Sequence, residues 1–222
     1  MSAGQEIMLF YLVCDESGSM GPNGGIETIN QSLPELHYAM VSDPLVVDKA
    51  RLSIIAFSDE AEVHLPLTQV SEVAELPGVQ VGGSTQYGKA FKLLRETIES
   101  DITEQKANGY RILRPCVFFI TDGVPSDGKW QDEFDQLMNH KWAPNVIAFG
   151  VDGARPDIIR KVGSLKAFMA ESGVSAGPAL ASIMESVGQT VVQSVTGDGR
   201  KLVLPPPPPG VVDLDSVDLD LM

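Results

Sequence analysis

Short apolar runs alternate along this chain with longer stretches in which apolar residues recur every three or four positions. The runs occupy residues 7–14, 50–58, 114–121 and 145–151, and a shorter one lies at 167–170. Runs of this length, rich in Ile, Val, Leu and Phe, are typical of strands buried on both faces of a sheet. The pattern therefore predicts an α/β fold whose strands are mostly parallel.

The stretches between these runs have the spacing of amphipathic helices. In residues 86–107, Phe91, Leu94, Ile98 and Ile102 form a single apolar stripe, which is the face that such a helix packs against a sheet. Alternation of strands with helices favours a doubly wound sheet covered by helices on both faces. The predicted helices cover residues 26–41, 86–107, 130–139, 156–162 and 178–194.

Two features interrupt this alternation. Residues 60–67 follow the strand at 50–58 after a tight turn at Asp59, so they predict a hairpin and one antiparallel edge strand. His64 lies in that strand and is interpreted as an edge or surface histidine rather than a metal ligand. Pro34 lies inside the first helix, where its missing N–H predicts a kink or a break.

The composition changes abruptly near residue 197. Residues 1–197 are predicted to form the folded domain, followed by a proline-rich linker at 198–210 and an acidic, apolar tail at 211–222. The tail is interpreted either as disordered or as a recognition segment that adds to a sheet edge or enters an apolar groove. A further hypothesis is that its aspartates bind a metal ion held by this chain or by another copy. These aspartates are Asp213, Asp215, Asp218 and Asp220.

The chain is acidic, with 30 Asp and Glu against 16 Lys and Arg and a formal net charge of -14. Such a charge repels phosphate, so it argues against nucleic acid as a partner and favours basic partner surfaces or a bound cation. The sequence has no apolar run of 18 residues and no basic segment before its first apolar run. It therefore predicts neither a membrane span nor a signal peptide, and we expect a cytoplasmic protein. Cys14 and Cys116 fall in separate buried strands, roughly 16 Å apart at about 3.3 Å per residue, which is too far for a disulfide.

Oxygen-bearing side chains follow two of the predicted buried strands. Asp15 ends the first strand, and Ser17 and Ser19 follow it at two-residue spacing. Asp122 ends a second buried strand, and Thr85 follows two glycines just before a helix. Because ligands of open α/β folds lie at the carboxyl ends of the strands, we expect these side chains to converge there. Two carboxylates and three hydroxyls suit a hard divalent cation such as Mg²⁺, and Mn²⁺ fits the same oxygens.

These residues resemble the metal-ion-dependent adhesion site of von Willebrand factor A domains, which reads D-x-S-x-S, then a distant Thr, then a distant Asp. The chain offers DESGS from Asp15 to Ser19, Thr85 in GGST and Asp122 in ITDG, and the resemblance covers about residues 5–195. It implies a protein-interaction module without enzymatic activity. In that module an acidic side chain of a partner protein takes the open position on the bound cation.

Three longer phrases are similar to the small bacterial TerY type of the tellurium-resistance group within that family. They are YLVCDESGSM, LSIIAFSDEAEVHLPLT and FFITDGVPSD. The similarity implies a cytoplasmic binding subunit in stress or metal-related signalling. Its partners would be proteins, often a protein kinase and a phosphatase of the PP2C kind.

Other functions stay open at the level of the sequence. Residues 83–90, GSTQYGKA, nearly spell a phosphate-binding loop, but Ala90 stands where the metal-binding hydroxyl belongs. The main alternative is a Mg²⁺-dependent phosphoryl-transfer enzyme that uses Asp15, although Ser17 replaces the second acid that such an enzyme would have. A third alternative is a vestigial domain whose site binds no metal and whose tail carries the function.

Overall fold

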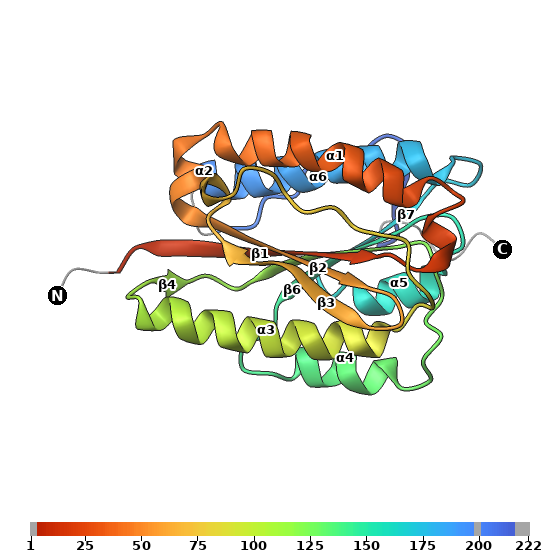
Figure 1. Ribbon diagram of the computed structural model, residues 1–222, viewed down its shortest axis with the longest axis horizontal. Helices are drawn as coiled ribbons and strands as arrows, with labels where there is room; N and C mark the ends of the chain where they lie inside the picture. The colour runs from red at the N-terminus through yellow and green to blue at the C-terminus, as the bar shows by residue number, and fades with distance from the viewer. Residues whose placement is uncertain (1–3, 198–200, 216–222) are drawn as a thin grey trace.

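The computed structural model describes residues 4–197 and 201–215, which form one mixed sheet between two layers of helices (Figure 1). The strands are β1 (Glu6–Asp15), β2 (Ala50–Phe57), β3 (Ala61–Thr68), β4 (Arg111–Ile112), β5 (Cys116–Thr121), β6 (Asn145–Gly150), β7 (Lys166–Ala170) and β8 (Val211–Asp213). Their order is β3-β2-β1-β5-β6-β7-β8, with β4 paired to β1. The two edge strands, β3 and β8, are antiparallel to their neighbours, and the other pairings are parallel.

Side chains of the central strand β1 face opposite ways in alternation, so they join two separate cores. Phe10 and Leu12 belong to the core under the first helix layer, whereas Leu9 and Tyr11 belong to the core under the second. Figure 1 shows α1 and α6 on one side of the sheet and α3 and α4 on the other. The first layer contains α1 (Gly25–Val41), α2 (Pro44–Lys49) and α6 (Ala176–Thr196); the second contains α3 (Tyr87–Ala107), α4 (Trp130–Met138) and α5 (Pro156–Val162).

This architecture confirms the predicted α/β doubly wound fold. The ends of the predicted strands and long helices agree with the structure within two residues. His64 lies in β3 at the edge of the sheet, as expected. The sequence did not predict β4 or α2, because a strand of 2 residues and a helix of 6 residues carry too little periodicity.

The structure differs from the predicted elements in two places. The predicted break at Pro34 does not occur, because α1 continues to Val41 with buried Leu33 and Leu36 on either side of an exposed proline. Those two side chains hold both halves of the helix on the sheet. The alternative, a kink at Pro34, stays a prediction. The sheet also has a second antiparallel edge strand, β8, where the sequence predicted only one.

The start of the acidic tail forms that second edge strand. Val211 pairs with Ala170 of β7, and Val211 and Leu214 are 5% and 6% exposed. Lys166 at the start of β7 pairs with Asp213 at 2.9 Å and with Asp215 at 3.5 Å. These two aspartates thus lie at the end of β7 that is opposite the carboxyl edge of the sheet. Asp218 and Asp220 are outside the described residues, and the domain boundary at residue 197 stays a prediction.

The two cysteines are free and buried, as the sequence predicted. Cys14 is paired in register with Ile120, four residues from Cys116, which offsets the two Cα atoms by about 13 Å along the strand direction at about 3.3 Å per residue. Within residues 4–197 and 201–215, no helix is long and apolar enough to cross a membrane.

Candidate metal centre

The carboxyl ends of β1 and β5 bring the predicted site residues together. Cys14 pairs with Ile120 in register, so Asp15 lies beside Thr121, the residue before Asp122. After Asp15 the chain turns into a short 3₁₀ helix, η1 (Gly18–Met20), which places Ser17 and Ser19 beside the strand ends. The parallel pairing of β1 with β5 therefore brings two distant stretches of sequence together in one cluster of oxygens.

Asp15 lies at the bottom of this cluster and is fully buried. Its Oδ2 atom accepts a hydrogen bond of 2.5 Å from the Thr121 hydroxyl, and its Oδ1 atom accepts one of 2.8 Å from the Ser17 backbone N–H. Burial raises the pKa of Asp15 to about 6, although the hydrogen bonds from Thr121 and Ser17 oppose that rise. A bound cation would favour the charged form of this carboxylate.

Asp122 directly follows β5 and joins Ser19 to the loop after η1. Its Oδ1 atom accepts a hydrogen bond of 2.8 Å from the Ser19 hydroxyl, and its Oδ2 atom accepts one of 2.7 Å from the Asn23 amide. The hydroxyls of Ser17 and Ser19 lie 3.2 Å apart. Burial raises the pKa of Asp122, and the negative charge of nearby Asp152 raises it further.

Thr85 reaches the cluster from the loop before α3. The space beside Gly123 shows how close the Thr85 hydroxyl lies to Asp15. A Cβ atom at Gly123 would lie 2.9 Å from the Thr85 hydroxyl and 3.5 Å from Asp15 Oδ2. Both oxygens therefore border the same small space. The structure thus brings together all five residues predicted from the sequence, namely Asp15, Ser17, Ser19, Thr85 and Asp122.

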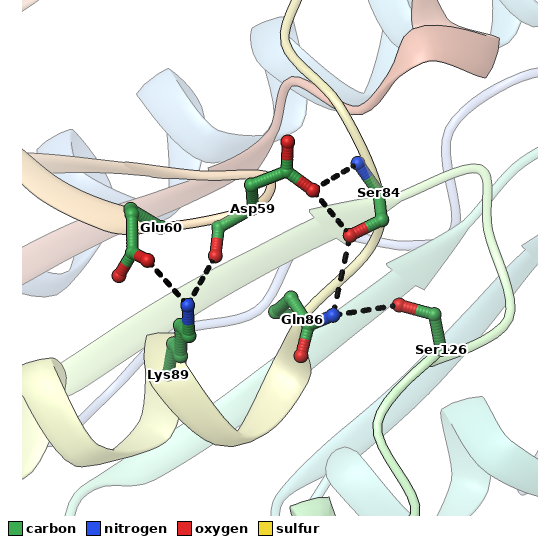
Figure 2. Close-up of polar contacts among 6 residues, drawn as sticks. All are labelled: Asp59, Glu60, Ser84, Gln86, Lys89 and Ser126. Carbon is green, nitrogen blue, oxygen red and sulfur yellow. Dashed lines mark hydrogen bonds and ion pairs between the residues drawn. The ribbon is translucent and has the colours of Figure 1, made fainter.

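A network of polar contacts holds the Thr85 loop in place (Figure 2). Asp59, in the turn between β2 and β3, accepts hydrogen bonds from the backbone N–H and the hydroxyl of Ser84, at 2.9 Å and 2.6 Å. On the other side of the loop, the backbone N–H and the hydroxyl of Ser126 donate to the Thr85 carbonyl. The Gln86 amide connects the two sides through Ser84 and Ser126.

Residues 83–90 resemble a phosphate-binding loop in sequence, but the same network gives Lys89 a different role. Lys89 donates to the Asp59 carbonyl at 2.6 Å and forms an ion pair with Glu60, so its charge is directed to the β2–β3 turn. No strand occurs between Thr68 and Arg111, whereas a phosphate-binding loop follows a buried strand.

The charges of the cluster are not balanced by the protein. Among the described residues, no Lys, Arg or His forms an ion pair with Asp15 or Asp122. Two buried carboxylates without a basic partner are costly, and a cation relieves that cost. The donors are all oxygens, which suits Mg²⁺ or Mn²⁺ better than a metal that prefers nitrogen or sulfur. The described residues contain no group of three or more His, Cys, Asp or Glu that could hold a metal ion, so the hydroxyls are essential to this interpretation.

Comparison with known families agrees with this geometry. The family sequence model of the von Willebrand factor type A domain matches residues 10–124, slightly more than half of the chain. The chain belongs to the von Willebrand factor type A family. Domains of this family are metal-dependent protein-interaction modules. The matched region contains all five of the clustered oxygen donors.

Solved structures with the same fold come from varied proteins. They include a von Willebrand factor type A protein from Catenulispora acidiphila (14% identity, TM-score 0.60, 84% of this chain and 43% of that chain). Proximal thread matrix protein 1 from the mussel byssus, with a zinc-occupied MIDAS motif, is 16% identical (TM-score 0.61, 85% and 48%). The pilus adhesin SpaC from Lactobacillus rhamnosus GG is 12% identical (TM-score 0.63, 86% and 31%). At these identities the likeness shows the fold, and this chain spans less than half of each. No curated protein matches the chain.

The structure adds residues to the candidate site that the sequence did not reveal. Thr121 and Asn23 donate directly to the two carboxylates, and Asp152 lies 3.4 Å from the Asn23 amide. Asp152 is also the non-glycine residue of the described chain with a positive φ, 48°. Thr121 could have been predicted from the strand register, because it directly precedes Asp122. Asn23 and Asp152 could not, because they belong to loops without a sequence pattern.

Proposed function

We propose that this von Willebrand factor A domain binds one divalent cation at its candidate metal centre and uses it to bind an acidic side chain of a partner protein. Asp15, Ser17, Ser19, Thr85 and Asp122 would hold the cation, which would attract a carboxylate from the partner. The observation that carries this proposal is the pair of buried carboxylates, Asp15 and Asp122, with no basic partner among the described residues.

The rim of the site suggests what surrounds that carboxylate. Val81 and Val124 are 56% and 43% exposed. Val124 follows Asp122 by two residues, and Val81 lies against Gly21, two residues after Ser19. Apolar side chains beside a cation favour an acidic residue flanked by apolar residues. The neighbouring acids Glu16 and Asp152 would repel a partner segment with several acids in a row.

The similarity to the TerY type supports a narrower proposal. The protein would be a cytoplasmic, non-enzymatic subunit of a bacterial stress or metal-response system, with a protein kinase and a PP2C-type phosphatase as candidate partners. The sequence phrases that surround Asp15 and Asp122 support this proposal.

Titration calorimetry with Mg²⁺ and Mn²⁺ tests the metal site. We expect Ser19→Ala, which removes an exposed ligand, to lower the affinity about 10- to 100-fold, and Asp15→Asn to lower it at least as much. Ser71→Ala is the matched control, because Ser71 is an exposed serine in η2 (Val70–Glu72). Equal affinity in the Ser19 and Ser71 variants would contradict the proposed site.

Capture of partners from a bacterial extract tests the interaction. Wild type and Ser19→Ala are compared with Mg²⁺ and with EDTA. Partners that are lost in EDTA and in the variant would support metal-dependent binding, and partners kept under all four conditions would contradict it. The same preparations are assayed for hydrolysis of a phosphate ester. Metal-dependent turnover that the Ser19 variant lacks would favour the phosphoryl-transfer alternative instead.

A further inference from the structure

A pocket lies at the amino ends of the strands, the pole opposite the candidate metal centre. Its volume is about 230 Å³, and it lies between the last turns of α3, the β4–β5 connection and the loop after α4. Ile102, Leu113 and Pro115 supply apolar walls, and Trp142 supplies an aromatic one. Arg114 and Lys141 lie at its exposed margin.

Positive charge gathers around this pocket in a chain that is strongly acidic. The Lys106 ammonium lies 3.6 Å from the centroid of the Trp142 ring, and the Lys141 ammonium lies 5.7 Å from it. Arg114 makes no hydrogen bond or ion pair with the described residues. Glu99 is the acid beside the pocket, and it lies 3.2 Å from the Lys141 ammonium. Among the described residues, Glu99 is the one acid that forms an ion pair with any of the three cations Lys106, Arg114 and Lys141, so the cations outnumber the acid that pairs with them.

The aromatic wall also contains an unused hydrogen-bond donor. The Trp142 indole N–H is buried and has no acceptor among the described residues. A buried donor without an acceptor costs about 1–3 kcal/mol. A carboxylate that enters the pocket would neutralise the surplus positive charge at its margin.

We propose that this pocket is a second docking site, for a protein segment in which acidic residues alternate with large apolar residues. The apolar residue would fill the space between Ile102, Pro115 and Trp142, and the acid would pair with Arg114 and Lys141. Charge complementarity argues for this partner, because a basic or neutral segment would leave the cationic margin uncompensated. The site uses no residue of the metal centre, so one copy of the chain can bind a partner at each pole.

A labelled peptide tests this proposal directly. The probe is Leu-Asp-Leu-Asp-Leu, measured by fluorescence anisotropy against the full chain in EDTA, which removes metal-dependent binding. We expect saturable binding that weakens as salt is raised, and that falls at least tenfold in Arg114→Glu/Lys141→Glu. The control variant Lys92→Glu/Lys161→Glu makes the same change of charge at two other exposed lysines and should bind as wild type does.

Two further comparisons complete the test. The peptide Leu-Asn-Leu-Asn-Leu should bind at least tenfold more weakly, because it lacks the charge. A chain ending at Asp215 retains every described element. If this chain binds the peptide more tightly than the full chain does, residues 216–222, SVDLDLM, compete with the peptide for the pocket, because they have the same alternation of acidic and apolar residues. The proposal is overturned if neither chain binds the acidic peptide, if the Arg114 and Lys92 double variants bind it equally, or if the Asn peptide binds equally well.

Discussion

The smallest residue of the candidate metal centre is also one of its most constrained. Gly123 has no side chain, and the space beside it is bordered by the Thr85 hydroxyl and an Asp15 oxygen. We predict that Gly123→Ala lowers Mg²⁺ affinity by about tenfold or more, because the new methyl group displaces Thr85. Gly128→Ala is the control, since a Cβ there meets nothing within 4 Å. Calorimetry of both variants checks this, and an unchanged affinity in Gly123→Ala would show that Thr85 is not needed.

At the scale of residues, the sequence predicted the ligands better than their supports. Asp15, Ser17 and Ser19 lie within five consecutive residues, and a buried strand fixes where they begin. Asp122 was predictable because it ends a second apolar run. Asn23 was not, because a glycine-rich loop brings it to Asp122 and no periodicity specifies the path of that loop.

At the scale of elements, β8 is an integral part of the sheet edge. Leu214 follows it, is 6% exposed and packs in the core under α3, α4 and α5. We predict that Leu214→Ala lowers the free energy of unfolding by about 2–3 kcal/mol, because it leaves a cavity in that core. Leu165→Ala, at a leucine that is 38% exposed, should cost less than about 1 kcal/mol. Urea unfolding measures both, and equal losses would mean that Leu214 contributes no buried contact.

The long elements were predictable because their apolar residues repeat many times. The strand β8 was not predictable, because it is too short to contain such a repeat. Only three residues form it, and they follow a run of prolines that predicts an extended linker. Its partner, β7, lies about forty residues earlier, so no local pattern joins them. The acids between its apolar residues also resembled a solvated tail, whereas two of them pair with Lys166.

The stability of the whole molecule should depend on pH below neutrality. Asp101 in α3 accepts a hydrogen bond of 2.9 Å from the buried Tyr11, and burial raises the pKa of Asp101 to about 6. The folded chain therefore binds more protons than the unfolded chain between about pH 4 and 6. The unfolding free energy of the metal-free protein should then fall as pH rises through this range.

The variant Asp101→Asn separates this contribution from the rest. This variant keeps an acceptor for Tyr11 but carries no charge. Between pH 4 and 6 its unfolding free energy should therefore fall less than that of the wild type. The difference should be about 1–2 kcal/mol, after allowance for the partial exposure of residue 101. Glu96→Gln, an exposed position on the same helix, should follow the wild-type curve. Asp15 and Asp122, whose pKa values are also raised, would maintain the remaining slope. Identical curves for all three proteins would rule out a role for Asp101.

The late position of β8 in the sequence has a consequence during synthesis. When the ribosome has released residues up to 170, β7 already has its parallel neighbour β6, but its other edge stays unpaired until residues 211–213 emerge. An open strand edge is a template for pairing with another nascent chain. Changes to the messenger RNA that slow or stop translation between codons 170 and 211 should therefore increase aggregation of this protein in cells. This is expected even though all the residues of the candidate metal centre have been synthesised by then.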